Sequence, residues 1–229
     1  MFKRKTIGLI LNIICSISAF SGVIIGFINA KRDGFNNAFQ RLLYFTNLSN
    51  IWIGIVCLVI ATISIIQLIN KRIIIKNYWF TLKYIFTVSI TITGLIFCAL
   101  LAPFAEFNVW TFSSILTHVV VPITAICSYF FEIPLNPMKK EHTWFALIPP
   151  LLYFIVGSIL SLLEVDFGRG QTYPYFFMNY RSEVGLFGFR NIDKPEMGSI
   201  YWIIVILFII IGISKLYYNL HSINKKSKK

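Results

Sequence analysis

The sequence predicts an all-α membrane protein, a single transmembrane domain over residues 1–229 folded as a bundle of six transmembrane helices. Composition is the first observation behind this prediction. Of the 229 residues, 57% are hydrophobic and 13% are charged, whereas a soluble domain carries about 25% charged residues. A soluble fold of this length has too little interior to bury so much apolar surface. The composition therefore excludes a soluble globular enzyme and a disordered chain.

Six continuous apolar runs are the second observation. Each reaches the roughly 20 residues that a helix needs to cross about 30 Å of hydrocarbon. The runs do not alternate with period two, which favours helices over a barrel. The first run continues past the roughly 7–15 residues of a signal-peptide core, so it is counted as a span. The predicted spans cover about residues 7–28, 43–69, 78–101, 111–131, 144–163 and 199–220.

The distribution of Lys and Arg predicts the orientation. The net charge is +12, and 14 of the 21 basic residues, Lys83 among them, fall on the side that carries both termini. Basic residues next to spans stay in the cytoplasm, so we expect a multi-pass protein of the cell membrane with both termini cytoplasmic. A nucleic-acid reader concentrates its charge on one soluble face. Membrane lipids, and not nucleic acids, are therefore the expected partners.

The four cysteines carry no sign of a metal or redox site. Each lies in a different apolar run, and no C-x-x-C pair occurs among Cys15, Cys57, Cys98 and Cys127. We interpret them as small buried hydrophobes and expect neither a metal nor a cofactor.

The long connection at 164–198, on the predicted outer side, combines glycine and proline with eight Tyr and Phe residues. Glycine and proline oppose a regular helix, while aromatic rings favour the membrane interface. Two interpretations stay open: a lid folded back over the bundle, or a flexible loop with an aromatic belt.

Polar side chains in the second span form one group. Thr46, Ser49 and Asn50 stand at i, i+3 and i+4, and therefore share one helix face. Such hydroxyls and amides often fasten neighbouring spans through hydrogen bonds. The alternative is that they line a site.

The fourth span contains His118, the only histidine within an apolar run. Ser114, His118 and Pro122 recur at every fourth residue and share a face, and Pro122 has no N–H to give to the His118 carbonyl. A hydrogen-bonded core histidine is one interpretation, and a functional ionisable group is the other.

Thr46 and His118 lie about 5 and 10 Å inside spans that start at the same membrane face. A hydroxyl and an imidazole at one level have the arrangement of a nucleophile and its base.

These elements resemble those of the androgen-induced protein family, six-span membrane proteins with bacterial relatives. The elements are Phe45-Thr46-Asn47-Leu48-Ser49-Asn50, Leu116-Thr117-His118 with Pro122, and Tyr173-Pro174-Tyr175. The resemblance covers essentially the whole chain through span number and motif order. Animal members are threonine hydrolases that cleave esters between fatty acids and hydroxy fatty acids. The resemblance thus implies an intramembrane hydrolase of fatty-acid esters in which Thr46 is the nucleophile and His118 the base.

Other polar residues complete the expected site. We expect Ser49 or Asn50 to donate to an oxyanion or to orient His118. The substrate-binding group further includes Ser114, Tyr173 and Arg181. An arginine pairs well with a carboxylate or a phosphate, although Arg181 could instead anchor its loop at the headgroups. No acid lies clearly inside a span, since Glu106 and Glu132 fall at span edges, so a dyad is favoured over a triad.

Two other functions remain open on the sequence alone. One is a small transporter whose polar residues line a substrate path, although the chain shows neither a repeated half nor a pair of broken helices. The other is a non-catalytic membrane scaffold in which these residues only fasten helices.

Overall fold

The computed structural model describes residues 2–71, 75–103, 108–132, 138–191 and 195–226. Within these residues, six helices are long and apolar enough to cross a membrane, which confirms the predicted fold class. Each predicted boundary lies within three residues of the observed one. The spans are Arg4–Ile28, Phe45–Asn70, Asn77–Leu101, Phe112–Phe131, His142–Leu162 and Ser199–Ser222.

Three of the six spans are interrupted in their helical geometry. The third continues from α3 (Asn77–Ile96) into a π-helical turn, η2 (Phe97–Leu101). The fourth consists of α4 (Phe112–Ile115), the π-helical turn η3 (Leu116–Val120) and α5 (Val121–Phe131). The fifth consists of α6 (His142–Phe145) and α7 (Ile148–Leu162). The other spans are α1 (Phe2–Ile28), α2 (Phe45–Asn70) and α8 (Ser199–Lys226).

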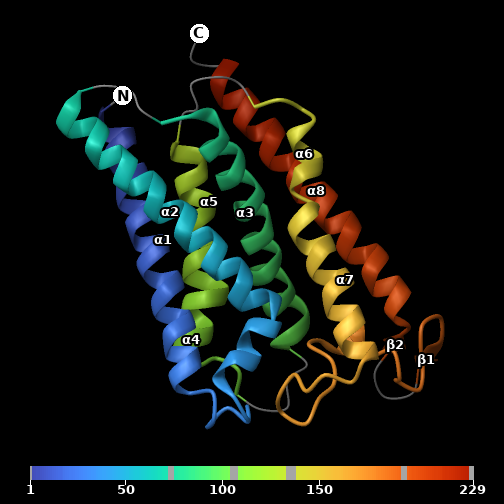
Figure 1. Ribbon diagram of the computed structural model, residues 1–229. Coiled ribbons are helices and arrows are strands. Elements are labelled where there is room, and N and C mark those ends of the chain that lie inside the picture. The colour runs from blue at the N-terminus through green and yellow to red at the C-terminus, as the bar shows by residue number, and fades with distance from the viewer. Residues whose placement is uncertain (1, 72–74, 104–107, 133–137, 192–194, 227–229) are drawn as a thin grey trace.

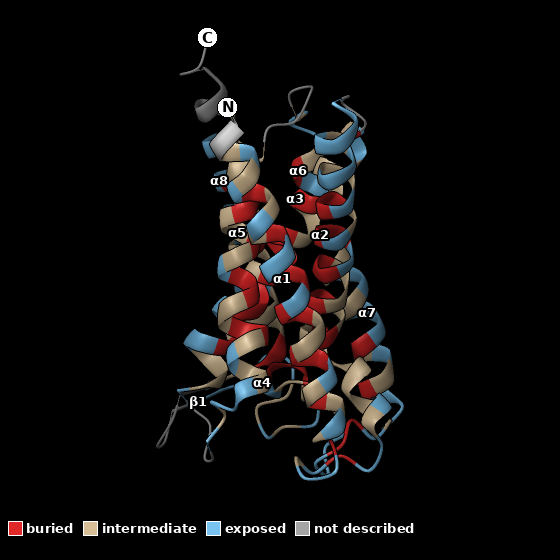
Figure 2. Ribbon diagram, turned by 90° about the vertical axis from the view of Figure 1, so that its left-hand side faces the viewer, coloured by how far each residue is buried: buried red, intermediate tan, exposed pale blue. Residues whose placement is uncertain are grey.

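Four helices form the core of the bundle, and two lie beside it. α1, α2, α3 and α5 pack together, while α7 and α8 lie on the far side of α3 (Figure 1). Buried residues are concentrated along the four core helices (Figure 2). Their contact is made by small and branched side chains, which allow close approach of helices in a membrane. These residues are Cys15, Ala19, Ile53, Cys57, Ile90, Val121 and Ala125.

Polar contacts fasten α8 to the rest of the bundle. The Tyr84 hydroxyl of α3 lies 2.6 Å from Ser214 Oγ, and Ser214 Oγ donates to the Thr143 carbonyl of α6 at 2.7 Å. Tyr217 Oη lies 3.1 Å from Thr91 Oγ1 of α3. All of these contacts belong to the half of α8 near the chain terminus. The other half of α8 borders an apolar cavity described below.

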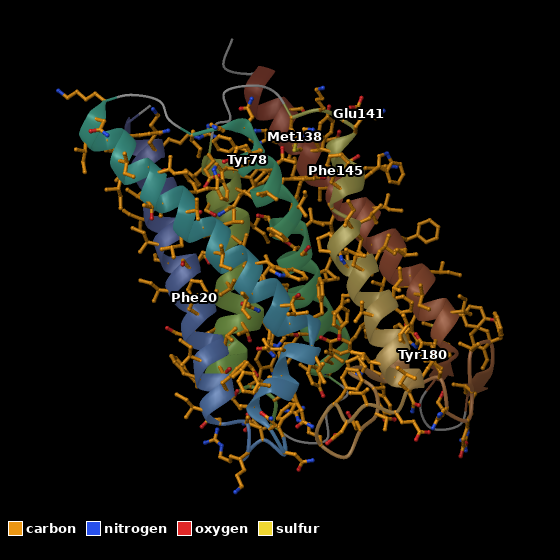
Figure 3. All side chains as sticks on the ribbon, in the orientation of Figure 1. Phe20, Tyr78, Met138, Glu141, Phe145 and Tyr180 are labelled. Carbon is orange, nitrogen blue, oxygen red and sulfur yellow. The ribbon has the colours of Figure 1, made fainter. Side chains whose placement is uncertain are left out.

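The two ends of the bundle differ in character. α1 begins and α8 ends at the same end, which we call the terminal end, and Tyr78 and Glu141 lie there (Figures 1 and 3). Tyr180 lies at the opposite end, called the loop end because the connections 29–44 and 163–198 lie there (Figure 3). Which end faces the cytoplasm stays a prediction.

The connection 163–198 divides into two parts. In the first, Phe167 and Met178 are completely buried, and the Phe167 carbonyl accepts a hydrogen bond from the Tyr44 hydroxyl at 3.1 Å. This part, which includes the short helix η4 (Phe176–Met178), folds over the bundle as a lid would. The second part holds an antiparallel pair of strands, β1 (Phe189–Asn191) and β2 (Pro195–Met197). Its aromatic residues Phe187 and Phe189 are exposed, as in a belt.

Three expectations about individual residues were wrong or fall outside the described residues. The sequence count assigned Lys83 to the basic residues outside the membrane on the side of the termini, but it lies in α3 and is completely buried. Leaving Lys83 out still gives 13 basic residues against 7. Cys98 is exposed, although Cys15 and Cys57 are buried as expected. Glu106 lies outside the described residues.

Candidate active site

A polar cavity of about 760 Å³ lies at the loop end of the bundle. Thr46 and His118, which the sequence predicts as the catalytic pair, both line it. Its volume falls within the roughly 300–1,000 Å³ of small-molecule sites. Of the predicted substrate-binding residues, Ser114 and Tyr173 also line the cavity, whereas Ser49, Asn50 and Arg181 do not.

Thr46 occupies the first turn of α2. The preceding segment is a 3₁₀ helix, η1 (Ala38–Leu43), and Tyr44 adopts an extended conformation that lets α2 start at Phe45. The first N–H groups of a helix have no partner within it, and they carry partial positive charge. The Thr46 N–H donates to the Tyr175 hydroxyl at 3.4 Å, and Thr46 Oγ1 lies 3.5 Å from the same oxygen. This position favours negative charge on or beside the Thr46 hydroxyl.

Tyr175 is a site residue that the sequence reasoning missed. It belongs to the Tyr173-Pro174-Tyr175 motif, in which residue spacing alone does not distinguish Tyr175 from Tyr173 as the site residue. Burial raises the pKa of the Tyr175 phenol, so the hydroxyl stays protonated at neutral pH and can donate a hydrogen bond. Its ring lies edge-on to Tyr44, whose own pKa burial raises to about 12. Tyr175 can therefore donate to an oxyanion formed beside Thr46.

Ser49 and Asn50 donate hydrogen bonds to the Thr46 carbonyl and do not line the cavity. Ser49 Oγ donates to the Thr46 carbonyl at 3.1 Å and lies 2.8 Å from Thr93 Oγ1 of α3. Asn50 Nδ2 donates to the carbonyls of Thr46 and Thr117, at 2.8 and 3.2 Å. Because both N–H groups of the amide are engaged, Asn50 has no donor left for an oxyanion in this arrangement. These contacts fasten α2 to α3 and η3.

The contact between Asn50 and Thr117 has a specific cause in the π-helical turn. In η3 the Val121 N–H bonds to the Leu116 carbonyl, five residues back instead of four. In that register Pro122 faces the Thr117 carbonyl, and proline has no N–H to give. Asn50 supplies the missing donor from the neighbouring helix. The carbonyl deprived by Pro122 in this register is therefore that of Thr117, and not that of His118 as the α-helical spacing predicts.

His118 lies in η3 and its imidazole is fixed by stacking. The ring centroids of His118 and Phe97 are 3.7 Å apart, with 8° between the ring planes. The ring also lies close to the backbone of Thr93. Nδ1 is buried and has no hydrogen-bond partner among the described residues, so the ring nitrogen that contacts Thr93 is Nε2. A neutral imidazole with Nε2–H and a free Nδ1 has its basic lone pair on Nδ1.

Thr46 and His118 are connected through Thr93 and share no direct hydrogen bond in the described part of the chain. The Thr93 backbone contacts the His118 ring, and its hydroxyl contacts Ser49, which in turn holds the Thr46 carbonyl. Proton transfer between the two would therefore run through water in the cavity, or after a small rearrangement. Sequence reasoning passed over Thr93 as one of several hydroxyl residues in the third span.

Gly94 allows α3 to approach η3 closely. A Cβ at Gly94 would lie 2.8 Å from the His118 carbonyl oxygen and 2.9 Å from Pro122 Cγ. Both turns that stack here, η2 and η3, are π-helical, and such turns are common at functional sites. The close approach brings Phe97 onto the His118 ring.

Gly94→Ala is expected to destabilise the protein by about 1–3 kcal/mol, because the added methyl group overpacks a rigid backbone contact. Gly212→Ala in α8 is the matched control, since a Cβ there would meet no atom within 4 Å. Thermal unfolding of the two variants in the same detergent measures the difference. Equal melting temperatures would show that the α3–η3 contact is not tight.

Two arginines give one side of the cavity a positive charge. Arg41 and Arg169 line it, and their guanidinium carbons lie 4.7 and 4.9 Å from the centroid of the Phe35 ring. Burial lowers the pKa of Arg41, an effect that its ion pair with Asp33 opposes. Arg169, and not the predicted Arg181, lines the cavity. Arg181 is exposed and forms an ion pair with Glu164 outside the cavity.

An apolar cavity of about 80 Å³ adjoins the polar one. It lies between α2 and α3 on one side and α7 and α8 on the other, and its walls are almost entirely aliphatic and aromatic. Thr46 and Tyr175 line both cavities. The Thr46 hydroxyl therefore belongs to the boundary between a polar and an apolar compartment.

Comparisons with family models, with curated proteins and with solved structures found no match to the chain. The described residues contain no group of three His, Cys, Asp or Glu side chains placed to hold a metal ion.

Proposed function

We propose that the protein hydrolyses fatty-acid esters within the membrane, with Thr46 as the nucleophile and His118 as the general base. The observation that carries the proposal is the position of Thr46 where the polar and the apolar cavity meet. A fatty-acid ester has the same division, because its acyl chain is apolar and its carbonyl group is polar. With the carbons nearest the ester group in the apolar cavity, the ester carbonyl reaches Thr46.

The geometry supports a two-step acyl transfer. After a small rotation of the ring that opens the buried Nδ1 to the cavity, His118 takes the proton of the Thr46 hydroxyl through a water molecule, and Thr46 Oγ1 attacks the ester carbonyl carbon. The Tyr175 hydroxyl and the partial positive charge at the start of α2 stabilise the oxyanion of the tetrahedral intermediate. The alcohol leaves with the proton held by His118. Water then attacks the acyl-threonine and releases the fatty acid.

The positive side of the polar cavity favours an ester whose alcohol part carries an anion. Arg41 and Arg169 are placed to pair with a carboxylate or a phosphate on that part. An ester of a hydroxy fatty acid has such a carboxylate, which agrees with the substrate class implied by the family resemblance.

Labelling with a fluorophosphonate probe tests the nucleophile. The wild type and Thr46→Ser are expected to react with the probe, whereas Thr46→Ala is expected to lose the label because the attacking oxygen is gone. Ser114→Ala is the matched control, since Ser114 is another hydroxyl residue that lines the same cavity. Labelling of Thr46→Ala at the wild-type level would overturn the proposal.

A further inference from the structure

A second group of ionisable residues lies inside the bundle, away from the candidate active site. Lys83 of α3 is completely buried, and its Nζ donates to Asn12 Oδ1 and, at 2.8 Å, to Cys57 Sγ. Asn12 Nδ2 donates to Glu132 Oε1 at 2.5 Å, and Lys83 Nζ lies 3.9 Å from the same oxygen. An ionisable group within a membrane span is costly, so a function is the default expectation for it.

The Glu132 carboxylate is only half satisfied by these contacts. Its Oε1 is bound by Asn12 and Lys83, but its Oε2 is buried and has no hydrogen-bond partner among the described residues. The side chain is 9% exposed. A buried carboxylate oxygen without a donor costs free energy comparable to a lost hydrogen bond, and more because it is charged. The Glu132 carboxylate therefore has acceptor capacity that its contacts with Asn12 and Lys83 leave unused.

Glu132 and Asn12 line a cavity of about 260 Å³ at the terminal end of the bundle. A single water needs only about 10–15 Å³ of such space, so the cavity has room for a larger polar group. Lys5 and Lys71, both exposed, also line it, as do the polar side chains of Ser64 and Gln67.

Basic and acidic side chains lie on opposite sides of this cavity. Lys5 and Lys71 bring positive charge to its exposed side, and the Glu132 carboxylate, partly balanced by Lys83, lies on its buried side. Arg4 adds a further positive charge close by, since its guanidinium donates to the carbonyls of Phe130 and Phe131 at the end of α5. A ligand that fits this arrangement carries an anion toward the lysines and a cationic N–H donor toward Glu132.

We propose that this cavity binds the phosphoethanolamine headgroup of a membrane phospholipid. The phosphate contacts Lys5 and Lys71, and the primary ammonium donates to the Glu132 carboxylate, which lines the cavity. Leu68 lines the cavity and is itself exposed on the outside of α2, so the cavity borders the lipid. The acyl chains of the bound lipid follow the exposed apolar side chains of that helix, among them Ile65 and Ile69. The site shares no residue with the proposed catalytic machinery.

Native mass spectrometry of the detergent-solubilised protein with added phospholipids tests the proposal. Phosphatidylethanolamine and phosphatidylcholine carry the same phosphate, but the quaternary ammonium of choline has no N–H. We expect the wild type to bind phosphatidylethanolamine at least about tenfold more tightly, the value of one hydrogen bond to a charged group. Glu132→Gln is expected to remove this preference.

Lipid binding by a variant of the exposed lysines is a second measurement, which does not depend on the buried pair of Lys83 and Glu132. Lys5→Ala combined with Lys71→Ala is expected to weaken the binding of both lipids by a similar factor, because both lose the phosphate contacts. Lys76→Ala is the matched control, since Lys76 is exposed and does not line the cavity.

Three results would overturn the proposal. The first is an unchanged preference for phosphatidylethanolamine in folded Glu132→Gln. The second is equal binding of phosphatidylglycerol, which has a phosphate and no ammonium. The third is undiminished lipid binding by the double lysine variant, which decides the matter even if Glu132→Gln does not fold.

Discussion

Replacing His118 with glutamine is expected to lower the rate of ester hydrolysis by about 10²–10⁴-fold, the usual contribution of a general base. Glutamine retains an N–H group that can donate to the Thr93 backbone, and its planar amide can lie against Phe97. It has no basic nitrogen, so the Thr46 hydroxyl keeps its proton. Turnover of a chromogenic fatty-acid ester in mixed micelles measures the effect.

The control for this substitution is His142→Gln. His142 lies in α6, and its ring stacks on Phe145 outside the polar cavity. We expect this variant to hydrolyse the ester at the wild-type rate. If His118→Gln were to change only the Michaelis constant and leave the turnover number intact, the imidazole would bind substrate without acting as a base.

Lys83→Met is expected to destabilise the protein by about 3–5 kcal/mol, because it leaves the buried Glu132 carboxylate without its counter-ion. Unlike the effect of His118→Gln, this loss concerns folding and not turnover. Unfolding of the purified protein by added denaturing detergent, followed by circular dichroism, measures it.

A double variant separates the ion pair from simple packing. Lys83→Met combined with Glu132→Gln removes both charges and keeps side chains of similar length, so we expect it to recover much of the lost stability. A double variant as unstable as Lys83→Met alone would mean that packing, and not the unpaired charge, accounts for the loss.

The span positions could be predicted because the membrane imposes them. A helix needs about 20 apolar residues to cross the hydrocarbon, and this requirement leaves an unbroken signal in the sequence. That Thr46 and His118 line one cavity was also predictable in part. Both lie near the start of spans that begin at the same end of the bundle, so their depths agree before any contact is known.

The ion pair of Lys83 and Glu132 could not be predicted in the same way. Both residues stand close to span ends, where a charged side chain ordinarily reaches water. Only the packing of α1, α2, α3 and α5 surrounds them, and such long-range packing has no local signal. The π-helical turns could not be predicted either, because one extra residue in a helical turn changes neither the composition nor the hydropathy of the span. Pro122 was the single hint of an irregular fourth span.

Which arginine of the connection 163–198 reaches the polar cavity could not be predicted either. Arg169 and Arg181 belong to one connection without regular periodicity, so sequence spacing gave no reason to prefer either. The choice depends on the path of the chain, in which the Arg169 N–H donates to the Gly34 carbonyl at 2.8 Å. That contact brings Arg169 to Phe35 and the cavity.

The division of the bundle into four core helices and a separate α7–α8 pair has a consequence for how such a protein can diversify. The groups proposed for catalysis come from the core helices and the lid, whereas much of the apolar wall comes from α7 and α8. Leu207 and Ile210 of that wall can therefore change in size without disturbing the hydrogen bonds around Thr46. In the proposed ester hydrolase, selectivity for acyl length can therefore evolve on one pair of helices while the proposed catalytic groups stay unchanged on the others.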